Sequence, residues 1–185
     1  MGSSKSANIL MVRYNYEERG QYAVLLKPRI DNRDSEYEVC SRIGLSAPAG
    51  YVDDFFKEIS VTWNKENTEY MYHEKKVDAV LIDEAQFLST EEVDKLSDIV
   101  DFCNIPVLCY GLRTDFQNHL FPGSKRLMEL ADVIEEVPTV CWCGKRAQCN
   151  TRYADGKIVR EGEQLMLGSN ESYVALCRKH YKEGK

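Results

Sequence analysis

The sequence contains no uninterrupted run of eighteen or more apolar residues, and no short basic segment followed by an apolar one at its start. A membrane-spanning helix and a secretory leader are therefore not expected. An excess of basic residues is missing as well: 24 Lys and Arg are scattered among 30 Asp and Glu, and the net charge is −6. We expect a soluble, cytoplasmic protein that binds neither a membrane nor a nucleic acid polymer.

Internal repeats and low-complexity tracts are also missing, and the composition fits no class of disordered protein. A chain of 185 residues, of which 43% are hydrophobic, can bury a core of its own. The length predicts one domain, or one domain with a small appendage.

Seven cysteines are an odd number, and a chain without an export signal is expected in a reducing compartment, where structural disulfides are rare. Metal binding or simple burial must then account for them. Cys103 and Cys109 lie in apolar segments and Cys40 is similar, so we interpret these three as small buried hydrophobic residues.

The order of segments predicts an α/β fold. Short apolar runs are typical of buried strands and occur at 22–26, 77–83 and 105–110. Helices are expected at 7–19, at 53–58 with an extension toward the sixties and seventies, at 90–102 and at 125–131. Gly20 suits the position just past the first helix, and Thr90 is expected to cap the third. Strands that alternate with helices favour a parallel sheet covered on both faces.

Two acids follow the strand in VDAVLIDEAQF. Asp83 and Glu84 are carried to the carboxyl edge of the sheet, which is where parallel sheets bind ligands. One acid can hold a magnesium ion, directly or through water, while its neighbour faces the reacting group. A solvated turn after a strand is the alternative, and these two residues alone do not decide between the two interpretations.

The opening letters MGSSKS also allow two interpretations. Expression tags often begin with the same letters, whereas a phosphate loop has the form G-x-x-x-x-G-K-[ST] and runs into a helix. Lys5 and Ser6, followed by a helix, a strand and the acid pair, favour the phosphate loop. Ser4 replaces the usual glycine, and the first glycine and the preceding strand would lie upstream of Met1. We therefore expect the natural protein to begin upstream of Met1.

From about Cys141 the composition shifts to cysteine, glycine and charge, which predicts a separate small subdomain. Cys141 and Cys143 form one close pair, and Cys177 and His180 form a second pair at the spacing of a tight turn. Two such pairs can close a tetrahedral site of three sulfurs and one nitrogen, which suits structural zinc. Cys149 is the competing fourth ligand and ranks below His180.

Together these motifs resemble thymidine kinases of the small cytosolic, zinc-containing type, in their bacterial branch. The resemblance spans nearly the whole chain and rests on Lys5-Ser6, YNYEERG (14–20), SRIGLSAPA (41–49), LIDEAQFL (81–88), IPVLCYGLRTDF (105–116), the cysteine motif and ESYVALCRKHYKE (171–183). It implies a P-loop-type parallel sheet flanked by helices over residues 1–138. A zinc-binding, ribbon-like subdomain with a lasso loop is implied over 139–185.

The resemblance also implies transfer of the γ-phosphoryl group of ATP to the 5′-hydroxyl of thymidine, or of deoxyuridine, in pyrimidine salvage for DNA synthesis. The implied cofactors are ATP, catalytic Mg²⁺ and structural Zn²⁺, and the implied assembly is a homotetramer. Glu84 matches the general base of the family. One carboxylate, one lysine and one metal ion are physically sufficient, because phosphoryl transfer needs positioning and charge neutralisation. A nucleoside-binding relative impaired by the shortened phosphate loop is the alternative.

Binding residues are implied by the same resemblance. On the nucleotide side they are Gly2, Ser3, Ser4, Lys5, Ser6, Asp31, Arg33, Asp83, Glu84, Ala85 and Gln86. Thymidine is implied to lie between the sheet edge and the zinc subdomain, on Phe116 and Tyr173, since aromatic faces suit a pyrimidine ring. A loop whose backbone reads the base edge is matched by Gln164, Leu165, Met166, Leu167 and Gly168. From the residues alone, Tyr173 would be a core aromatic and Phe116 a loop anchor.

Overall fold

The computed structural model describes residues 4–30, 37–63, 68–154, 156–164 and 172–184. Its centre is a parallel sheet of four strands in the order β4-β1-β8-β9. The strands are β1 (Ala23–Lys27), β4 (Gly50–Tyr51), β8 (Ala79–Ile82) and β9 (Val107–Cys109). In register, Leu25 lies beside Leu81, which lies beside Leu108. The predicted parallel sheet is confirmed.

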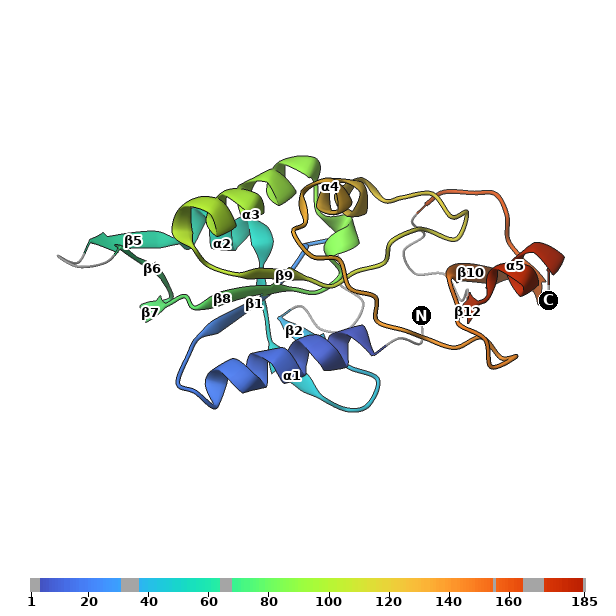
Figure 1. Ribbon diagram of the computed structural model, residues 1–185, viewed down its shortest axis with the longest axis horizontal. Coiled ribbons are helices and arrows are strands. Elements are labelled where there is room, and N and C mark those ends of the chain that lie inside the picture. Colours follow the sequence, from blue (N-terminus) through green and yellow to red (C-terminus); the bar gives the residue numbers. More distant parts are fainter. Residues whose placement is uncertain (1–3, 31–36, 64–67, 155, 165–171, 185) are drawn as a thin grey trace.

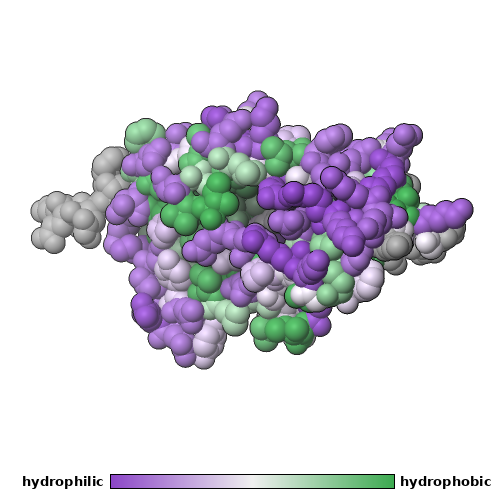
Figure 2. Space-filling view, turned by 45° about the vertical axis from the view of Figure 1, so that its right-hand side comes forward, coloured by the Kyte–Doolittle hydropathy of each residue, from purple (hydrophilic) through white to green (hydrophobic). Residues whose placement is uncertain are grey.

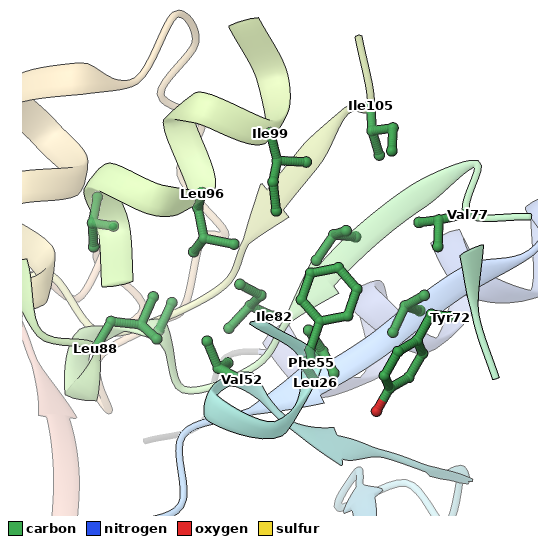
Figure 3. Close-up of a cluster of buried hydrophobic side chains, with 14 residues drawn as sticks. Leu26, Val52, Phe55, Tyr72, Val77, Ile82, Leu88, Leu96, Ile99 and Ile105 are labelled. Carbon is green, nitrogen blue, oxygen red and sulfur yellow. The ribbon is translucent and has the colours of Figure 1, made fainter. Parts of the chain in front are cut away.

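Helices cover both faces of this sheet, with α1 on one side and α2, α3 and α4 on the other (Figure 1). Their bounds are α1 (Lys5–Glu17), α2 (Val52–Glu58), α3 (Thr90–Cys103) and α4 (Pro122–Leu130). Side chains alternate along a strand, so Leu25 and Leu81 pack with Ile9 of α1. Leu26 and Ile82 pack on the opposite face, with residues of α2 and α3 (Figure 3). Burial on both faces explains the continuous apolar runs of β1 and β8.

The expected helical extension beyond Glu58 is wrong. Helix α2 ends there, and an antiparallel sheet of β5 (Ser60–Trp63), β6 (Thr68–Tyr72) and β7 (Lys75–Lys76) follows. β5 and β6 are rich in β-branched and aromatic residues, which favour strands over helix. A short hairpin of β2 (Glu38–Cys40) and β3 (Ser46–Pro48) lies between β1 and β4 in the chain.

The cap of α3 is Ser89 and not, as expected, Thr90. The amide N–H of Glu92 donates to the Ser89 hydroxyl at 3.1 Å, and the Glu92 carboxylate accepts from the amide of Ser89 at 2.8 Å. This reciprocal pair is a capping box, which sets the start of the helix one residue after Ser89. Gly20 follows α1 as expected and has a φ of +70°, a backbone conformation that glycine adopts without strain.

The cysteines interpreted as buried hydrophobic residues are only partly buried. Cys103 and Cys109 pack against the core beside α3 and β9, while Cys40 lies in the β2–β3 hairpin. Cys109 ends β9, an edge strand of the described sheet, and Cys103 is the last residue of α3. Cys40 ends β2 in a hairpin of only two strands. These end and edge positions leave the three side chains partly exposed.

The carboxyl-terminal part is a separate antiparallel sheet in the order β11-β10-β12, followed by helix α5. Its elements are β10 (Cys149–Ala154), β11 (Lys157–Ile158), β12 (Ser172–Leu176) and α5 (Arg178–Glu183), and they lie beyond the carboxyl ends of the main strands (Figure 1). On the face shown in Figure 2, hydrophobic side chains form small patches among hydrophilic ones. None of the described helices is long and apolar enough to cross a bilayer. The expected boundary between residues 138 and 139 stays a prediction.

Gly123, in the first turn of α4, packs directly on backbone atoms. A methyl group there would lie 2.5 Å from the carbonyl oxygen of Leu88 and 2.9 Å from those of Ala85 and Gln86. Backbone atoms cannot turn aside as the end of a side chain can. We expect Gly123→Ala to lower the free energy of unfolding by about 1–3 kcal/mol, measured by chemical denaturation. The exposed Lys125→Ala, in the same helix, should change it by less than about 0.5 kcal/mol, and equal effects would contradict the prediction.

Candidate active site

The acid pair and the start of α1 meet at the carboxyl edge of the sheet. Asp83 follows β8 directly and is buried, and its amide donates to the carbonyl of Leu26. The hydroxyl of Ser6, in the first turn of α1, donates to Asp83 Oδ2 at 2.8 Å. Residues 77 positions apart in sequence are thereby joined in one site.

The Asp83 carboxyl titrates above its usual range. Burial is the largest cause and raises its pKa above 3.8, and the nearby charge of Glu84 raises it further. Hydrogen bonds from the Ser6 hydroxyl and the Glu84 amide lower the pKa, as does the charge of Lys5, but these effects are smaller together. A cation beside this carboxyl would favour its charged form.

Glu84 is held by an uncommon backbone conformation and by a neighbouring amide. Its φ is +51°, in the left-handed region, which costs a non-glycine residue about 1–3 kcal/mol. Its carboxylate accepts a hydrogen bond from Nε2 of the buried Gln86, whose Oε1 accepts from the amide of Leu112 at 3.0 Å. A Cβ at Gly111 would lie 2.8 Å from that Oε1, so glycine leaves room for the amide. The carboxylate of Glu84 is thus oriented by Gln86, whose own amide group is held by the Leu112 amide.

The amino-terminal end of α1 carries the features of an anion site. Helix α1 begins at Lys5, its cap residue Ser4 makes no side-chain capping hydrogen bond, and its first turn holds no acid. The first amides of a helix lack intrahelical partners and lie at the positive end of its dipole, which suits a phosphate group. Lys5 adds a full positive charge close to Asp83, as its effect on the pKa of that carboxyl shows.

The two predicted substrate aromatics lie around one arginine, which the sequence analysis did not select. Phe116 is buried, and the guanidinium carbon of Arg152 lies 3.9 Å from the centre of its ring. Arg152 of β10 stands opposite Tyr173 of β12 in the antiparallel register, and its Nε donates to the Tyr173 hydroxyl at 2.9 Å. The sequence marks Arg152 only as a charged residue within a strand. Its contacts could not be predicted, because they depend on the register between β10 and β12.

Asp115 is a second residue that sequence reasoning missed. It is buried beside Phe116, and it accepts hydrogen bonds from the amides of Gln117 and His119 through Oδ1. Its other oxygen accepts from Nε2 of Gln164 at 2.9 Å. The predicted substrate residue Gln164 is therefore tied to the loop that carries Phe116.

The three cysteines and one histidine predicted as zinc ligands lie together. The candidate ligand atoms of Cys141, Cys143, Cys177 and His180 are all within 4.8 Å of one another. Burial raises the pKa of Cys141, but hydrogen bonds from backbone amides and from His180 outweigh it and lower the pKa to about 6. Three thiols and one imidazole held this close together fit a tetrahedral Zn²⁺ with no open position. Cys149 is buried in the same small core but lies outside this group.

The remaining predicted site residues lie either in the core or outside the described part of the chain. Ala85 is fully buried in the main core, and its amide donates to the carbonyl of Tyr110 at 2.9 Å. Outside the described residues are Gly2, Ser3, Asp31, Arg33, Leu165, Met166, Leu167 and Gly168.

A parallel sheet with a helix amino terminus facing strand-end acids defines the class: an α/β protein of the P-loop-type phosphotransferases. The family model described as thymidine kinase matches residues 1–181. The chain belongs to the thymidine kinase family, and the predicted resemblance is confirmed.

Relatives named thymidine kinase match almost the full length of the chain. One from Legionella pneumophila (strain Paris) is 46% identical over 186 residues, covering 100% of this chain and 87% of the relative. One from Haemophilus influenzae (strain ATCC 51907 / DSM 11121 / KW20 / Rd) is 46% identical over 187 residues, covering 99% and 92%. One from Enterobacteria phage T4 is 46% identical over 184 residues, with the same coverage of 99% and 92%.

The raised pKa of Asp83 predicts that this residue destabilises the ligand-free protein at neutral pH. The fold favours the protonated carboxyl, so its contribution to stability is full below 3.8 and is lost as the pH rises through the higher folded-state pKa. An asparagine side chain at this position would stay neutral, accept from the Glu84 amide and donate to Ser6. We expect Asp83→Asn to raise the Tm, by an amount that grows from about pH 4 and then levels off, and to abolish most activity.

Thermal unfolding from pH 4 to pH 8 checks this prediction for Asp83→Asn. The exposed Asp101→Asn, on α3, serves as control and should change the Tm little at any of these pH values. A Tm for Asp83→Asn below that of the parent protein at neutral pH would show that the charged carboxylate stabilises the free site.

Proposed function

We propose that this protein transfers the γ-phosphoryl group of ATP to the 5′-hydroxyl of thymidine, and also of deoxyuridine, to give the monophosphate. Membership of the thymidine kinase family over residues 1–181 supports this reaction. The observation that carries it is the hydrogen bond from Ser6 to Asp83, which joins the phosphate-binding helix end to the acid pair. A nucleoside-binding relative without activity is not favoured, because the family match includes both halves of the site.

On the nucleotide side, Lys5 and the first amides of α1 bind the phosphates of ATP. Ser6 and Asp83 offer oxygen atoms 2.8 Å apart, and they would hold Mg²⁺. When bound, Mg²⁺ neutralises charge on the triphosphate. Glu84 takes the proton of the 5′-hydroxyl as the bond from that oxygen to the γ-phosphorus forms and the bond to the departing ADP breaks. Gln86 keeps the Glu84 carboxylate aimed at the hydroxyl.

On the nucleoside side, Phe116 and Tyr173 hold the pyrimidine ring, and Gln164 begins the segment that contacts the edge of the base. We assign the backbone readout of the base to residues 164–168. The hydrogen bond between Gln164 and Asp115 supports this arrangement, because it joins the start of that segment to the Phe116 loop.

Cys141, Cys143, Cys177 and His180 would bind a structural Zn²⁺. Their role in the reaction is indirect. Zinc would fix α5, whose Tyr181 hydroxyl donates to the carbonyl of Phe116 at 2.9 Å. The metal centre thereby supports the loop that holds the nucleoside. A cytoplasmic homotetramer is the assembly that we propose from the family, and sedimentation velocity of the purified protein tests the oligomeric state.

The reaction is tested with purified protein, thymidine, ATP and Mg²⁺. Thymidine monophosphate and ADP should form in equal amounts, and chelation of Mg²⁺ should stop both. Thymidine binding without turnover would support the impaired relative instead. A protein that neither binds thymidine nor forms the monophosphate would overturn the proposal.

A further inference from the structure

Arg152 is the largest of the fully buried side chains, with 1% of its surface exposed. Burying a guanidinium is costly unless hydrogen bonds and aromatic faces replace its water. Arg152 has both: its Nε donates to the Tyr173 hydroxyl at 2.9 Å and its Nη1 donates to the Glu163 carbonyl at 3.2 Å. Its guanidinium also lies 3.9 Å from the centre of the Phe116 ring. One planar group therefore contacts three separate segments.

Each of those segments carries a residue assigned above to the nucleoside. Phe116 lies on the loop after β9, Tyr173 lies on β12, and Glu163 immediately precedes Gln164. Antiparallel pairing places Arg152 directly opposite Tyr173, so the sheet register fixes the backbone position from which the Arg152 side chain extends. A rigid, planar cation can stack on one ring while it donates to two oxygens, which a lysine ammonium cannot do in the same way.

We infer that Arg152 is a positioning residue for the nucleoside: it fixes the relative orientation of the Phe116 ring, the Tyr173 ring and the Glu163–Gln164 backbone. This inference rests on the proposed function. Arg152 acts through the two aromatic residues and not on the transferred phosphoryl group. Its loss should therefore weaken nucleoside binding more than it slows the chemical step.

The test compares steady-state kinetics of Arg152→Lys with those of the parent protein. Lysine keeps the positive charge and the apolar stem but loses the plane and the fork of donors. We expect the KM for thymidine to rise about tenfold or more, while the KM for ATP and kcat each stay within about threefold. The KM of an enzyme does not depend on how much of it is active, so partial unfolding would lower only the apparent kcat.

A double-mutant cycle tests whether Arg152 affects the KM for thymidine through Tyr173. Tyr173→Phe removes the hydroxyl that accepts from Arg152 and keeps the ring. If Arg152 acts through Tyr173, the fold-change in the KM for thymidine in the double variant will be smaller than the product of the two single changes. Independent, multiplicative effects would contradict coupling between the two residues.

Failure of the inference is distinguishable from failure of the proposed function. A parent protein that forms no thymidine monophosphate would overturn the proposed function itself. An active parent with an unchanged KM for thymidine in Arg152→Lys would overturn the inference alone, as would equal increases in both KM values. Calorimetric titration with thymidine in the absence of ATP gives a second readout, in which the dissociation constant should rise by about the same factor as the KM.

Discussion

Glu84→Gln should lower kcat by about 10²- to 10⁴-fold and leave the KM for thymidine nearly unchanged. Glutamine has the shape of glutamate, and its Oε1 can still accept the hydrogen bond that Gln86 donates. It cannot take up the proton of the 5′-hydroxyl at neutral pH. The substitution therefore removes the proposed general base while it keeps the geometry of the site.

Retained geometry can be checked in the same experiment. Thymidine binding by calorimetry should match that of the parent protein, and the Tm should not fall, since the left-handed backbone at position 84 is kept. Glu91→Gln, at an exposed position in the first turn of α3, is the matched control and should leave kcat unchanged. Full turnover by Glu84→Gln would exclude Glu84 as the base and direct attention to Asp83.

The parallel sheet could be predicted because two of its strands leave a clear pattern in the sequence. β1 and β8 are buried on both faces, and this burial requires the continuous apolar runs that the sequence displays. The β5–β7 sheet has strands of only two to five residues, which are too short for a period of two to be told from the helical period of the preceding segment. For α3, the spacing of Ser89 and Glu92 would have identified the cap, because a capping box needs a glutamate three residues after the serine.

In the candidate site, too, some residues could be predicted from the sequence and others could not. Spacing along the chain was enough to select Cys141, Cys143, Cys177 and His180, since two short-range pairs need only one long-range contact to form a cluster. Arg152 and Asp115 have no such local pattern. Strand register brings Arg152 to Tyr173, 21 residues further along the chain, and Asp115 accepts a hydrogen bond from Gln164, 49 residues further along. Local spacing in the sequence does not specify contacts over such separations.

Cys177→Ser should reduce bound zinc from about one ion per chain to almost none. The Sγ of Cys177 lies 3.5 Å from Nδ1 of His180 and 4.0 Å from the Sγ of Cys143. Replacing this thiol therefore removes one of the four zinc ligands. Structural zinc contributes about 10–16 kcal/mol of binding free energy in small zinc-dependent folds, far more than a single buried contact. Cys177 also precedes α5 as its cap residue, so that helix should lose its anchor.

The consequence should extend to the nucleoside site. Without a fixed α5, the hydrogen bond from Tyr181 to the carbonyl of Phe116 is weakened, so the KM for thymidine should rise together with the loss of zinc. Metal analysis, limited proteolysis and thymidine kinetics on the same preparation measure the three effects. Cys149→Ser is the control, because this cysteine is buried in the same small core but lies outside the ligand group. If Cys149→Ser released the zinc and Cys177→Ser retained it, the ligand set would have to be reassigned, because a tetrahedral site accepts only four protein ligands.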